Sequence, residues 1–459
     1  MQKTCLLGFR PAVHSSLDFG RKQVYGWLLQ PIPKLKVFAI VIVEETEAPA
    51  VWTPAFAAAA PRDLCTDCGI SRTANPKRCG RACQFIQPNY PQMEARVHGR
   101  PRNLHKSDEV FFGVFQKMVR AAMREPRPNA QWTGITTRIG ERLLETGAVD
   151  AVLTMTADPQ DRWRPMPAIV TRPEGMAEAR GMRMGYAPLL ALLEPALRRG
   201  YKRLAVIGVP CQIYALRALE SELGLKRLYV IGTPCSDNTT TENFHTFLAL
   251  LSDKPETISY LEFRADYHVE LRFTNGKVKE IPFLLLPISK LPRDFFPLTC
   301  RTCVDYTNSL SDITVGYMGG EGQQWLLVRN ERGEELLDLL GDEVRLGAPG
   351  SAGNRAGPVK GFLKNTELAA GGLPVRGMPN WVRPLAGWLM PKIGPRGLEF
   401  ARARVEMKAI ESVLHLRAQR RRRMRHMIPA HLWQIVHSYG VTPLEGERSA
   451  RQDETLAIP

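Results

Sequence analysis

Residues 193–235 read LEPALRRGYKRLAVIGVPCQIYALRALESELGLKRLYVIGTPC, and this stretch decides the fold. It contains two short apolar runs that end in glycine, Leu204–Gly208 and Leu228–Gly232, with helix-like segments before and between them. Short, continuously apolar strands that alternate with helices are typical of a parallel sheet covered on both faces. The stretch therefore predicts an α/β protein with some α+β character, built on a central mixed sheet with flanking helices.

A cysteine follows each apolar run in the same setting, Cys211 in GVPC and Cys235 in GTPC. Ligands of open α/β sheets bind at the carboxyl ends of the strands, so both cysteines are expected where chemistry takes place. A single core cysteine is more often a small buried apolar side chain. Two cysteines after the same G-x-P pattern favour a functional pair.

Patterns on either side of this stretch extend the fold. GERLLETGAVDAVLTM, residues 140–155, indicates an amphipathic helix that turns through Gly147 into a buried strand. Residues 257–288 alternate between apolar and polar side chains and contain Asn275-Gly276, a strong hairpin signal, so a small antiparallel insertion is expected. Beyond a Gly/Pro-rich linker that begins near residue 349, the chain is expected to be helical.

The composition narrows the class of protein. The 459 residues include 62 Lys and Arg against 46 Asp and Glu, a formal charge of +16, in otherwise ordinary globular proportions. No apolar run approaches the about 20 residues of a membrane-spanning helix, and no secretory signal is evident, so a cytoplasmic protein with reduced thiols is expected. Arg420–Arg423 lack interleaved aromatic residues, so we expect no nucleic-acid partner, and peripheral contact with a membrane stays open.

Eight of the nine cysteines form two groups of four, with Cys5 left over. The first group has the spacing C-x2-C-x10-C-x3-C, and the second combines the two strand-end cysteines with the C-x2-C of TCRTC. Clustered thiolates select zinc or iron-sulfur centres. Zinc ribbons usually pair two C-x2-C knuckles, so the C-x3-C spacing favours iron-sulfur, with a zinc-containing nucleic-acid binder as the non-enzyme alternative.

Several segments resemble one known family. GVPCQIYALRAL, GTPCSDN, CRTCVDYTNSLSDITVGYMG and WTGITTRIGERLLETGAVDAV resemble the beta subunits of deazaflavin-reducing hydrogenases and dehydrogenases. CTDCG, DPQDRWRPMP, RGMRMGYAPLLALLEPA and GPRGLEFARARVEMKAI resemble the branch of that family that reduces chlorophyll precursors with ferredoxin. The likeness covers about residues 60 to 440. It departs at Ser311, where the family usually has Ala, and at Trp132-Thr133-Gly134, where it has Ser-Gly-Gly.

The resemblance implies an oxidoreductase that acts on a CH-CH group with reduced ferredoxin as donor, FAD and two 4Fe-4S clusters as cofactors, and a role in (bacterio)chlorophyll biosynthesis. The implied substrate is 3,8-divinyl (proto)chlorophyllide, whose 8-vinyl group becomes ethyl. The alternatives are a 7-hydroxymethyl chlorophyll a reductase and a deazaflavin-linked iron-sulfur flavoprotein.

The resemblance also implies site residues. The cluster ligands would be Cys65, Cys68, Cys79 and Cys83 for one cluster and Cys211, Cys235, Cys300 and Cys303 for the other. The flavin-binding residues would be Gly134, Thr136, Thr137, Gly185, Tyr186, Gly316, Met318 and Gly319, with helix capping as the alternative for the first three. Candidate proton donors are Asp158, Asp161, Arg162 and His98, for each of which a surface salt bridge or a helix cap is the alternative.

Four segments are expected from these patterns. Residues 1–60 form a poorly defined leader, and residues 61–125 an N-terminal ferredoxin-like iron-sulfur segment. Residues 126–348 form the flavin and iron-sulfur α/β catalytic domain. Residues 349–459 form the linker and the helical C-terminal region.

Overall fold

The computed structural model describes residues 17–19, 22–26, 40–41, 49–56, 64–86, 88–317, 323–369 and 378–448. The chain divides into two compact units, residues 1–49 and residues 50–459. In the first, β1 (Leu17–Phe19), β2 (Lys22–Gly26) and β3 (Ile40–Val41) form a small sheet in that order, with antiparallel pairing. The remaining elements described below belong to the second unit.

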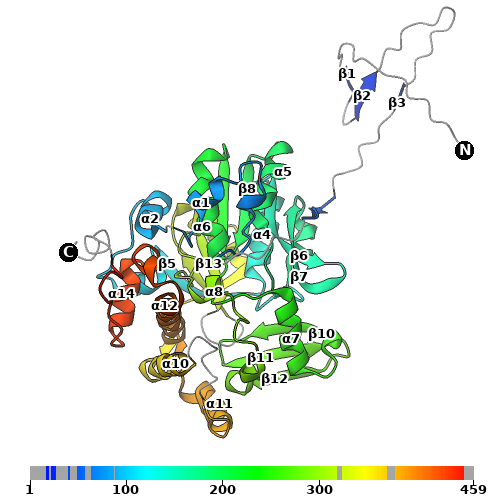
Figure 1. Ribbon diagram of the computed structural model, residues 1–459. Coiled ribbons are helices and arrows are strands. Elements are labelled where there is room, and N and C mark those ends of the chain that lie inside the picture. The colour runs from blue at the N-terminus through cyan, green and yellow to red at the C-terminus, as the bar shows by residue number, and fades with distance from the viewer. Residues whose placement is uncertain are drawn as a thin grey trace, which may run out of the picture. The chain divides into compact units, whose positions relative to one another are not determined.

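A nine-stranded mixed sheet forms the centre of the second unit (Figure 1). In spatial order its strands are β15 (Val344–Gly347), β5 (Lys117–Met123), β14 (Gln324–Val328), β13 (Ile313–Tyr317), β9 (Arg227–Gly232), β8 (Arg203–Gly208), β6 (Ala151–Asp158), β7 (Asp161–Val170) and β4 (Val51–Trp52). The four middle strands, from β13 to β6, run parallel, and the outer strands pair antiparallel. The predicted mixed sheet is therefore confirmed.

Both faces of the parallel strands are buried. On β8, Leu204 and Val206 pack into a core with α5 (Leu193–Arg198) and α6 (Pro210–Leu219), while Ala205 packs into a second core. That second core contains α4 (Ile135–Glu145) and α9 (Glu331–Asp338). This double coverage explains why the strand sequences are continuously apolar instead of alternating.

The expected antiparallel insertion follows β9. It consists of α7 (Thr241–Leu251) packed on β10 (Ile258–Phe263), β11 (His268–Phe273) and β12 (Val278–Pro282). Between β11 and β12 the chain turns through Gly276 at φ 80°, a left-handed conformation that suits glycine. The turn therefore lies where the Asn275-Gly276 pair predicts it.

Helices before and after the sheet share one core. In its described part, the predicted ferredoxin-like segment is made of loops and short helices, and it is followed by β5 of the central sheet. The helices are η1 (Ile70–Arg72), α1 (Arg78–Ala82), α2 (Tyr90–His98) and α3 (Ser107–Phe112). The C-terminal helices are α10 (Ala356–Leu368), α11 (Val382–Ile393), α12 (Leu398–Arg420), α13 (Met424–Met427) and α14 (Ala430–His437). Val110 and Phe112 of α3 pack with Ile410 of α12 and with Tyr306.

The smaller elements complete the described chain. They are α8 (Leu298–Arg301), β16 (Ser351–Ala352), β17 (Arg396–Gly397) and the 3-10 helices η2 (Pro173–Ala179), η3 (Leu189–Leu192), η4 (Glu220–Glu222), η5 (Pro255–Thr257), η6 (Phe283–Leu285), η7 (Ile288–Lys290), η8 (Gly341–Glu343) and η10 (Arg421–Arg423).

Two boundaries differ from the sequence expectation. The expected leader includes β4, which pairs with β7 at the edge of the central sheet. Two residues are too few to show a strand periodicity, which explains why this strand was not predicted. The expected Gly/Pro-rich linker is also short, because β16 pairs with β17 and α10 already begins at Ala356. Among the described residues, no helix is both long and apolar enough to cross a membrane.

Candidate functional site

Four cysteines from three separate segments of the chain line one pocket at the carboxyl ends of β8 and β9. Gly208 and Gly232 are paired in register, so these two strands end side by side. The cysteines of this second group are Cys211 in the first turn of α6, Cys235 after β9, Cys300 in α8 and Cys303 just after α8. Gly185 and Tyr186, predicted to bind flavin, line the same pocket. The topology thus brings this whole group together.

Burial governs the ionisation of these thiols. It raises the pKa of Cys303 to about 12 and holds the pKa values of Cys211 and Cys235 well above the usual range. The neighbouring cysteines of the group raise the same three pKa values further by mutual repulsion of their negative charges. Such thiols stay neutral and inert unless a cation binds them as thiolates. The site therefore has the donor chemistry of a metal centre.

In the first group, Cys65 and Cys68 lie on a tight loop, Cys79 lies in α1, and Cys83 caps the C-terminus of that helix. Burial raises the pKa of Cys68 to about 12, and the charges of the other three cysteines add to the rise. Gly69 has φ 107°, and a Cβ at this position would overlap the backbone of Ala191. The amide of Leu190 donates to the Cys68 carbonyl at 2.9 Å. The loop is therefore held closely against η3.

The two groups are neighbours. Thr66, in the first loop, hydrogen-bonds through its side chain to Cys211 and lowers the pKa of that thiol, against the larger effect of burial. Gln84, which follows Cys83, donates from Nε2 to Sγ of Cys303 at 3.6 Å. Each contact joins the first segment directly to a thiol of the second group.

The described thiols are not arranged for a single ion. No group of three or more His, Cys, Asp or Glu side chains in the described ranges has an arrangement that would hold one metal ion. Four thiolates on one zinc ion, each about 2.3 Å away, lie about 3.8 Å from one another. A four-iron cluster binds each thiolate at a different iron and needs a wider spacing. Each group of four thiols is a donor set that suits an iron-sulfur cluster as well as zinc.

Helix α12 supplies a buried cation beside the second group. Lys408 is only 4% exposed, and its Nζ lies 2.8 Å from both Oδ1 of Asp237 and Oε2 of Glu411. Asp237 lines the cysteine pocket, and the charge of Lys408 lowers the pKa values of Cys300 and Cys303, which burial raises. Ser412 donates from Oγ to the Cys303 carbonyl at 2.6 Å. Sequence reasoning missed this lysine; its one signal is a charge within the apolar face of a helix.

The predicted flavin residues fall into two places. Gly134 caps α4 at φ 85°, with Thr136 and Thr137 in the first turn. The side chain of Gln324 occupies this terminus, because its Oε1 accepts from the Ile135 amide at 3.2 Å and from the Thr133 hydroxyl at 3.0 Å. A phosphate at this point would have to displace Gln324.

The second place is the cysteine pocket itself. The Tyr186 hydroxyl lies 3.6 Å from Sγ of Cys300, and Gly185 donates its amide to Oδ1 of Asn238 at 3.2 Å. Gly316 of β13 packs closely on Pro234, the residue before Cys235, so a Cβ at Gly316 would overlap the proline ring. Met318 and Gly319 lie outside the described residues.

Three candidate proton donors occupy the turn between β6 and β7, at the strand edge that also bears the cysteines. Asp158 accepts from the Gln160 amide at 2.8 Å, while Arg162 is exposed. Oδ2 of Asp161 lies 2.8 Å from Nε2 of His245. Burial is the largest single effect on the pKa of Asp161 and raises it, but the hydrogen bonds to the His245 ring and to the Trp163 amide, together with nearby positive charge, bring the pKa below its usual value. These contacts leave the three residues outside the lining of the cysteine pocket.

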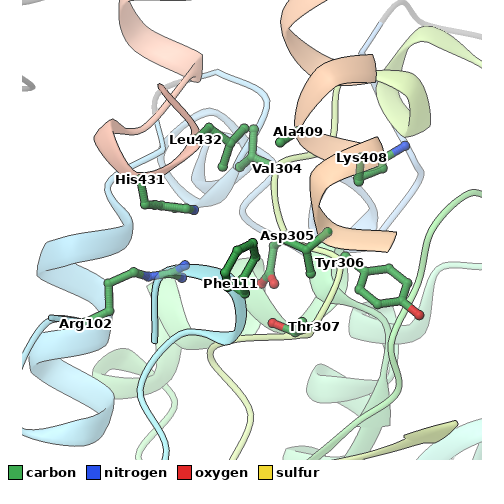
Figure 2. A pocket seen from close by; sticks show the side chains of 11 residues that line it. Arg102, Phe111, Val304, Asp305, Tyr306, Thr307, Lys408, Ala409, His431 and Leu432 are labelled. Atoms are coloured by element: carbon green, nitrogen blue, oxygen red, sulfur yellow. The ribbon is translucent and has the colours of Figure 1, made fainter. Parts of the chain in front are cut away.

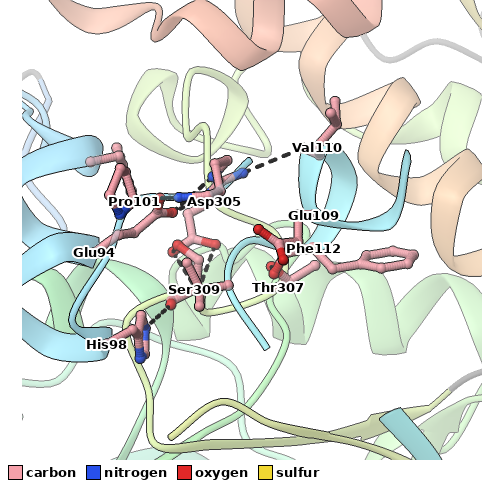
Figure 3. Close-up of polar contacts among 12 residues, drawn as sticks. Glu94, His98, Pro101, Glu109, Val110, Phe112, Asp305, Thr307 and Ser309 are labelled. Atoms are coloured by element: carbon pink, nitrogen blue, oxygen red, sulfur yellow. Dashed lines mark hydrogen bonds and ion pairs between the residues drawn. The ribbon is translucent and has the colours of Figure 1, made fainter. Parts of the chain in front are cut away.

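His98 occupies a buried polar network instead (Figure 3). Its Nε2 lies 2.8 Å from the Ser309 carbonyl and its Nδ1 lies 3.3 Å from Nδ2 of Asn330, so both ring nitrogens are in use. Burial, helped by the charge of Arg329, lowers its pKa to about 3. The ring is therefore neutral and suited to holding the fold together. A lone histidine in the sequence gives no sign of such burial.

The same network supports the second C-x2-C loop. Asp305, two residues after Cys303, accepts the Ser309 amide at 3.0 Å, and Arg102 pairs with Glu94 through its Nε at 2.8 Å. Figure 2 shows Arg102 and Asp305 facing one small cavity, together with His431 of α14. The loop is thus held by residues from both ends of the chain.

Comparisons with known proteins place the chain in a family. Residues 118–194 match the N-terminal model, and residues 201–348 the C-terminal model, of the coenzyme F420 hydrogenase/dehydrogenase beta subunit. An uncharacterized protein of Nostoc sp. is 38% identical over 379 residues, which cover 82% of this chain and 94% of that protein. The chain belongs to the family of coenzyme F420 hydrogenase/dehydrogenase beta subunits. The predicted family is confirmed.

Other members of this family indicate the class of reaction. The 7-hydroxymethyl chlorophyll a reductase of Oryza sativa is 37% identical over 392 residues, covering 82% of this chain and 83% of that one. A component of the F(420)H(2) dehydrogenase of Methanosarcina mazei is 28% identical over 273 residues, covering 58% of this chain and 70% of that one. The chain is therefore an oxidoreductase. Helices α10 to α14 lie beyond the residues that the two family models match.

Proposed function

We propose that the chain is a ferredoxin-dependent reductase of a chlorophyll-type tetrapyrrole, and that it reduces the 8-vinyl group of 3,8-divinyl (proto)chlorophyllide to ethyl. The observation that carries the redox part is the contact between the two cysteine groups, through Thr66 at Cys211 and Gln84 at Cys303. A pair of adjacent clusters is what a chain needs to pass single electrons inward. The identity to the Oryza sativa reductase supports a tetrapyrrole as the electron acceptor.

In this proposal each group of four cysteines binds one 4Fe-4S cluster, and FAD binds near the second. Bound FAD supplies the conversion from one-electron donors to a two-electron reduction. The flavin contacts proposed are Gly134, Thr136, Thr137, Gly185, Tyr186, Gly316, Met318 and Gly319. Of these, Gly185 and Tyr186 are best placed, because they line the pocket of the second group. The N-terminus of α4 is the weaker candidate, since Gln324 already occupies it.

The residues around the second group orient and shield it. Tyr186 places its hydroxyl against Cys300, and Lys408 keeps a positive charge beside the thiolates. Asp158, Asp161 and Arg162 remain candidate proton donors because they lie at the same edge of the sheet. His98 offers no ring nitrogen to a substrate.

The second candidate substrate is 7-hydroxymethyl chlorophyll a, which the identity to the Oryza sativa enzyme favours directly. This reaction would use the same donor and cofactors and would differ only in the pigment pocket. The arrangement of the cysteines therefore does not tell which of the two pigments is the substrate, and an experiment is needed to decide.

The test uses the full chain, purified without oxygen, with reduced ferredoxin and each pigment in turn. We expect divinyl chlorophyllide to give the 8-ethyl product, seen as a blue shift of the Soret band, and 7-hydroxymethyl chlorophyll a to be unchanged. The reverse pattern would show that the proposed substrate is wrong. Failure with both pigments, in a preparation that carries iron and flavin, would exclude the function as a whole. Cys300→Ala is the matched inactive control.

A further inference from the structure

The helix α11 presents an apolar face to solvent. Trp381, which immediately precedes the helix, is 80% exposed, Leu385 is 61% exposed and Trp388 is 59% exposed. Their spacing of four and then three residues puts all three on one side of the helix. Exposed apolar side chains scattered singly are ordinary, but a contiguous group that includes two indoles marks a contact surface.

The opposite side of α11 is fixed to the protein. Gly387 is buried, and a Cβ there would lie 3.5 Å from Cβ of Pro282 and 3.6 Å from Cγ of Leu285. Leu285 is itself 43% exposed. Figure 1 shows α11 at the end of the C-terminal helices, well away from the central sheet. The helix is therefore held in place with its apolar face outward.

The sequence around α11 is basic. Residues 368–398 contain no Asp or Glu and four basic residues, Arg376, Arg383, Lys392 and Arg396; of these, Arg383 is buried and Arg376 lies outside the described residues. Nζ of Lys392 lies 3.4 Å from the centroid of the Trp388 ring, so its charge sits on the exposed indole. Tryptophan beside lysine, on a helix with basic flanks, is typical of segments that lie in the headgroup region of a bilayer.

We propose that α11 docks the protein on an anionic lipid bilayer. Trp381, Leu385 and Trp388 enter the headgroup region, while Lys392 and Arg396 contact the lipid headgroups. Charge favours this partner over a second copy of the chain, because two such faces would bring only like charges together. An acidic soluble protein would match the charge but would leave the two indoles without an apolar partner. The proposal does not depend on which pigment is reduced.

The experiment is flotation of the full chain with vesicles of phosphatidylcholine, with and without phosphatidylglycerol. We expect binding to the anionic vesicles only, with a blue shift of tryptophan emission. The double variant Trp381→Ser/Trp388→Ser should lose about tenfold or more of this binding. The matched control, Leu346→Ser/Leu444→Ser, removes side chains that are 50% and 47% exposed elsewhere on the protein and should bind as the parent does.

Iron content and thermal stability of the double variant should equal those of the parent, since both indoles are exposed. Lys392→Glu gives a second test, because it should weaken binding to anionic vesicles without removing an indole. Equal binding by the parent and the double variant would overturn the proposal, as would no binding by the parent. The proposal would also be overturned if the parent formed a dimer or a ferredoxin complex, and the double variant lost that complex but still bound the vesicles.

Discussion

Nζ of Lys408 lies 2.8 Å from Oδ1 of Asp237, two residues after Cys235. This ion pair joins a helix beyond the family-model match to the loop that carries a cysteine of the second group. Burial raises the pKa of Asp237 to about 6, opposed by the charge of Lys408. The C-terminal helix is thus bound to the loop that lines the cysteine pocket.

Loss of the Lys408 ammonium should destabilise the fold strongly. Lys408→Met leaves Asp237 and Glu411 buried without their shared cation, which costs about 3–5 kcal/mol in the free energy of unfolding. Lys360→Met, at an exposed position of α10, is the matched control and should change stability by about 0.5 kcal/mol or less. Urea unfolding measures both. A Lys408→Met protein as stable as the parent would disprove this account of the ion pair.

Iron content tests the assignment of the cysteines. Cys68→Ala and Cys300→Ala each remove one ligand from a different group of four, so each should halve the iron bound per chain. Cys5→Ala, outside both groups, should leave the iron content unchanged. Iron analysis of anaerobically purified protein is the measurement. Full iron content in either of the first two variants would contradict the assignment.

Gly316 should be intolerant of a methyl group. In Gly316→Ala the new Cβ overlaps the ring of Pro234 and forces the neighbouring Cys235 to move. We therefore expect reduced cluster content and a lower melting temperature. Gly357→Ala on α10 is the control, because a Cβ there would meet no atom within 4 Å. Equal iron content in both variants would show that the strand and the GTPC loop adjust freely.

The half-buried imidazole of His98 makes stability depend on pH. Its folded-state pKa of about 3 lies below the unfolded value of about 6.5, so between these values only the unfolded chain binds a proton. Stability should fall as the pH drops through this window, by about 2 kcal/mol between pH 7 and pH 5 from this residue alone.

The variant His98→Gln should show a correspondingly smaller loss in urea unfolding at the two pH values, since glutamine does not titrate. His437→Gln, at an exposed position, serves as the control and should retain the loss of the parent. If His98→Gln loses as much stability as the parent, the imidazole of His98 is not the group responsible.

The electron donor should be ferredoxin. The described residues and the sequence contain no dinucleotide fingerprint of the form G-x-G-x-x-G after a strand, so NADPH alone should give no turnover. With ferredoxin, rates should fall as salt rises, because a chain of charge +16 gains encounter rate from fields screened over about 8 Å at physiological ionic strength. Steady-state rates across a salt series check this. Comparable turnover with NADPH would refute it.

Much of the sheet could be predicted because the sequence of each strand and turn reflects its own burial and backbone conformation. The run Leu204–Gly208 is apolar at consecutive positions, as a strand buried on both faces requires, and the hairpin turn places a glycine, Gly276, where φ is positive. Strand β4 could not be predicted, since two residues carry no periodicity. Strands β5 and β15 were also not predicted, because their place at one edge depends on pairing between distant segments.

In the candidate site, too, some contacts could be predicted from the sequence and others could not. The meeting of Cys211 and Cys235 follows from parallel strands that end together, which the pattern of each strand indicates. The contact of Gln84 with Cys303 depends on how two segments far apart in the chain pack, and no local pattern encodes it. His98 illustrates the opposite error, because an unperturbed pKa near neutrality applies only to a solvated ring.

The two groups of cysteines differ in how much chain each needs. The first lies within residues 65–83, so its four thiols leave the ribosome almost together. The second spans residues 211–303, and Lys408 and Ser412 of α12 pack against it. Assembly at the proposed second cluster therefore needs segments that are synthesised well after its first cysteine, whereas the first group is complete within a few residues of translation.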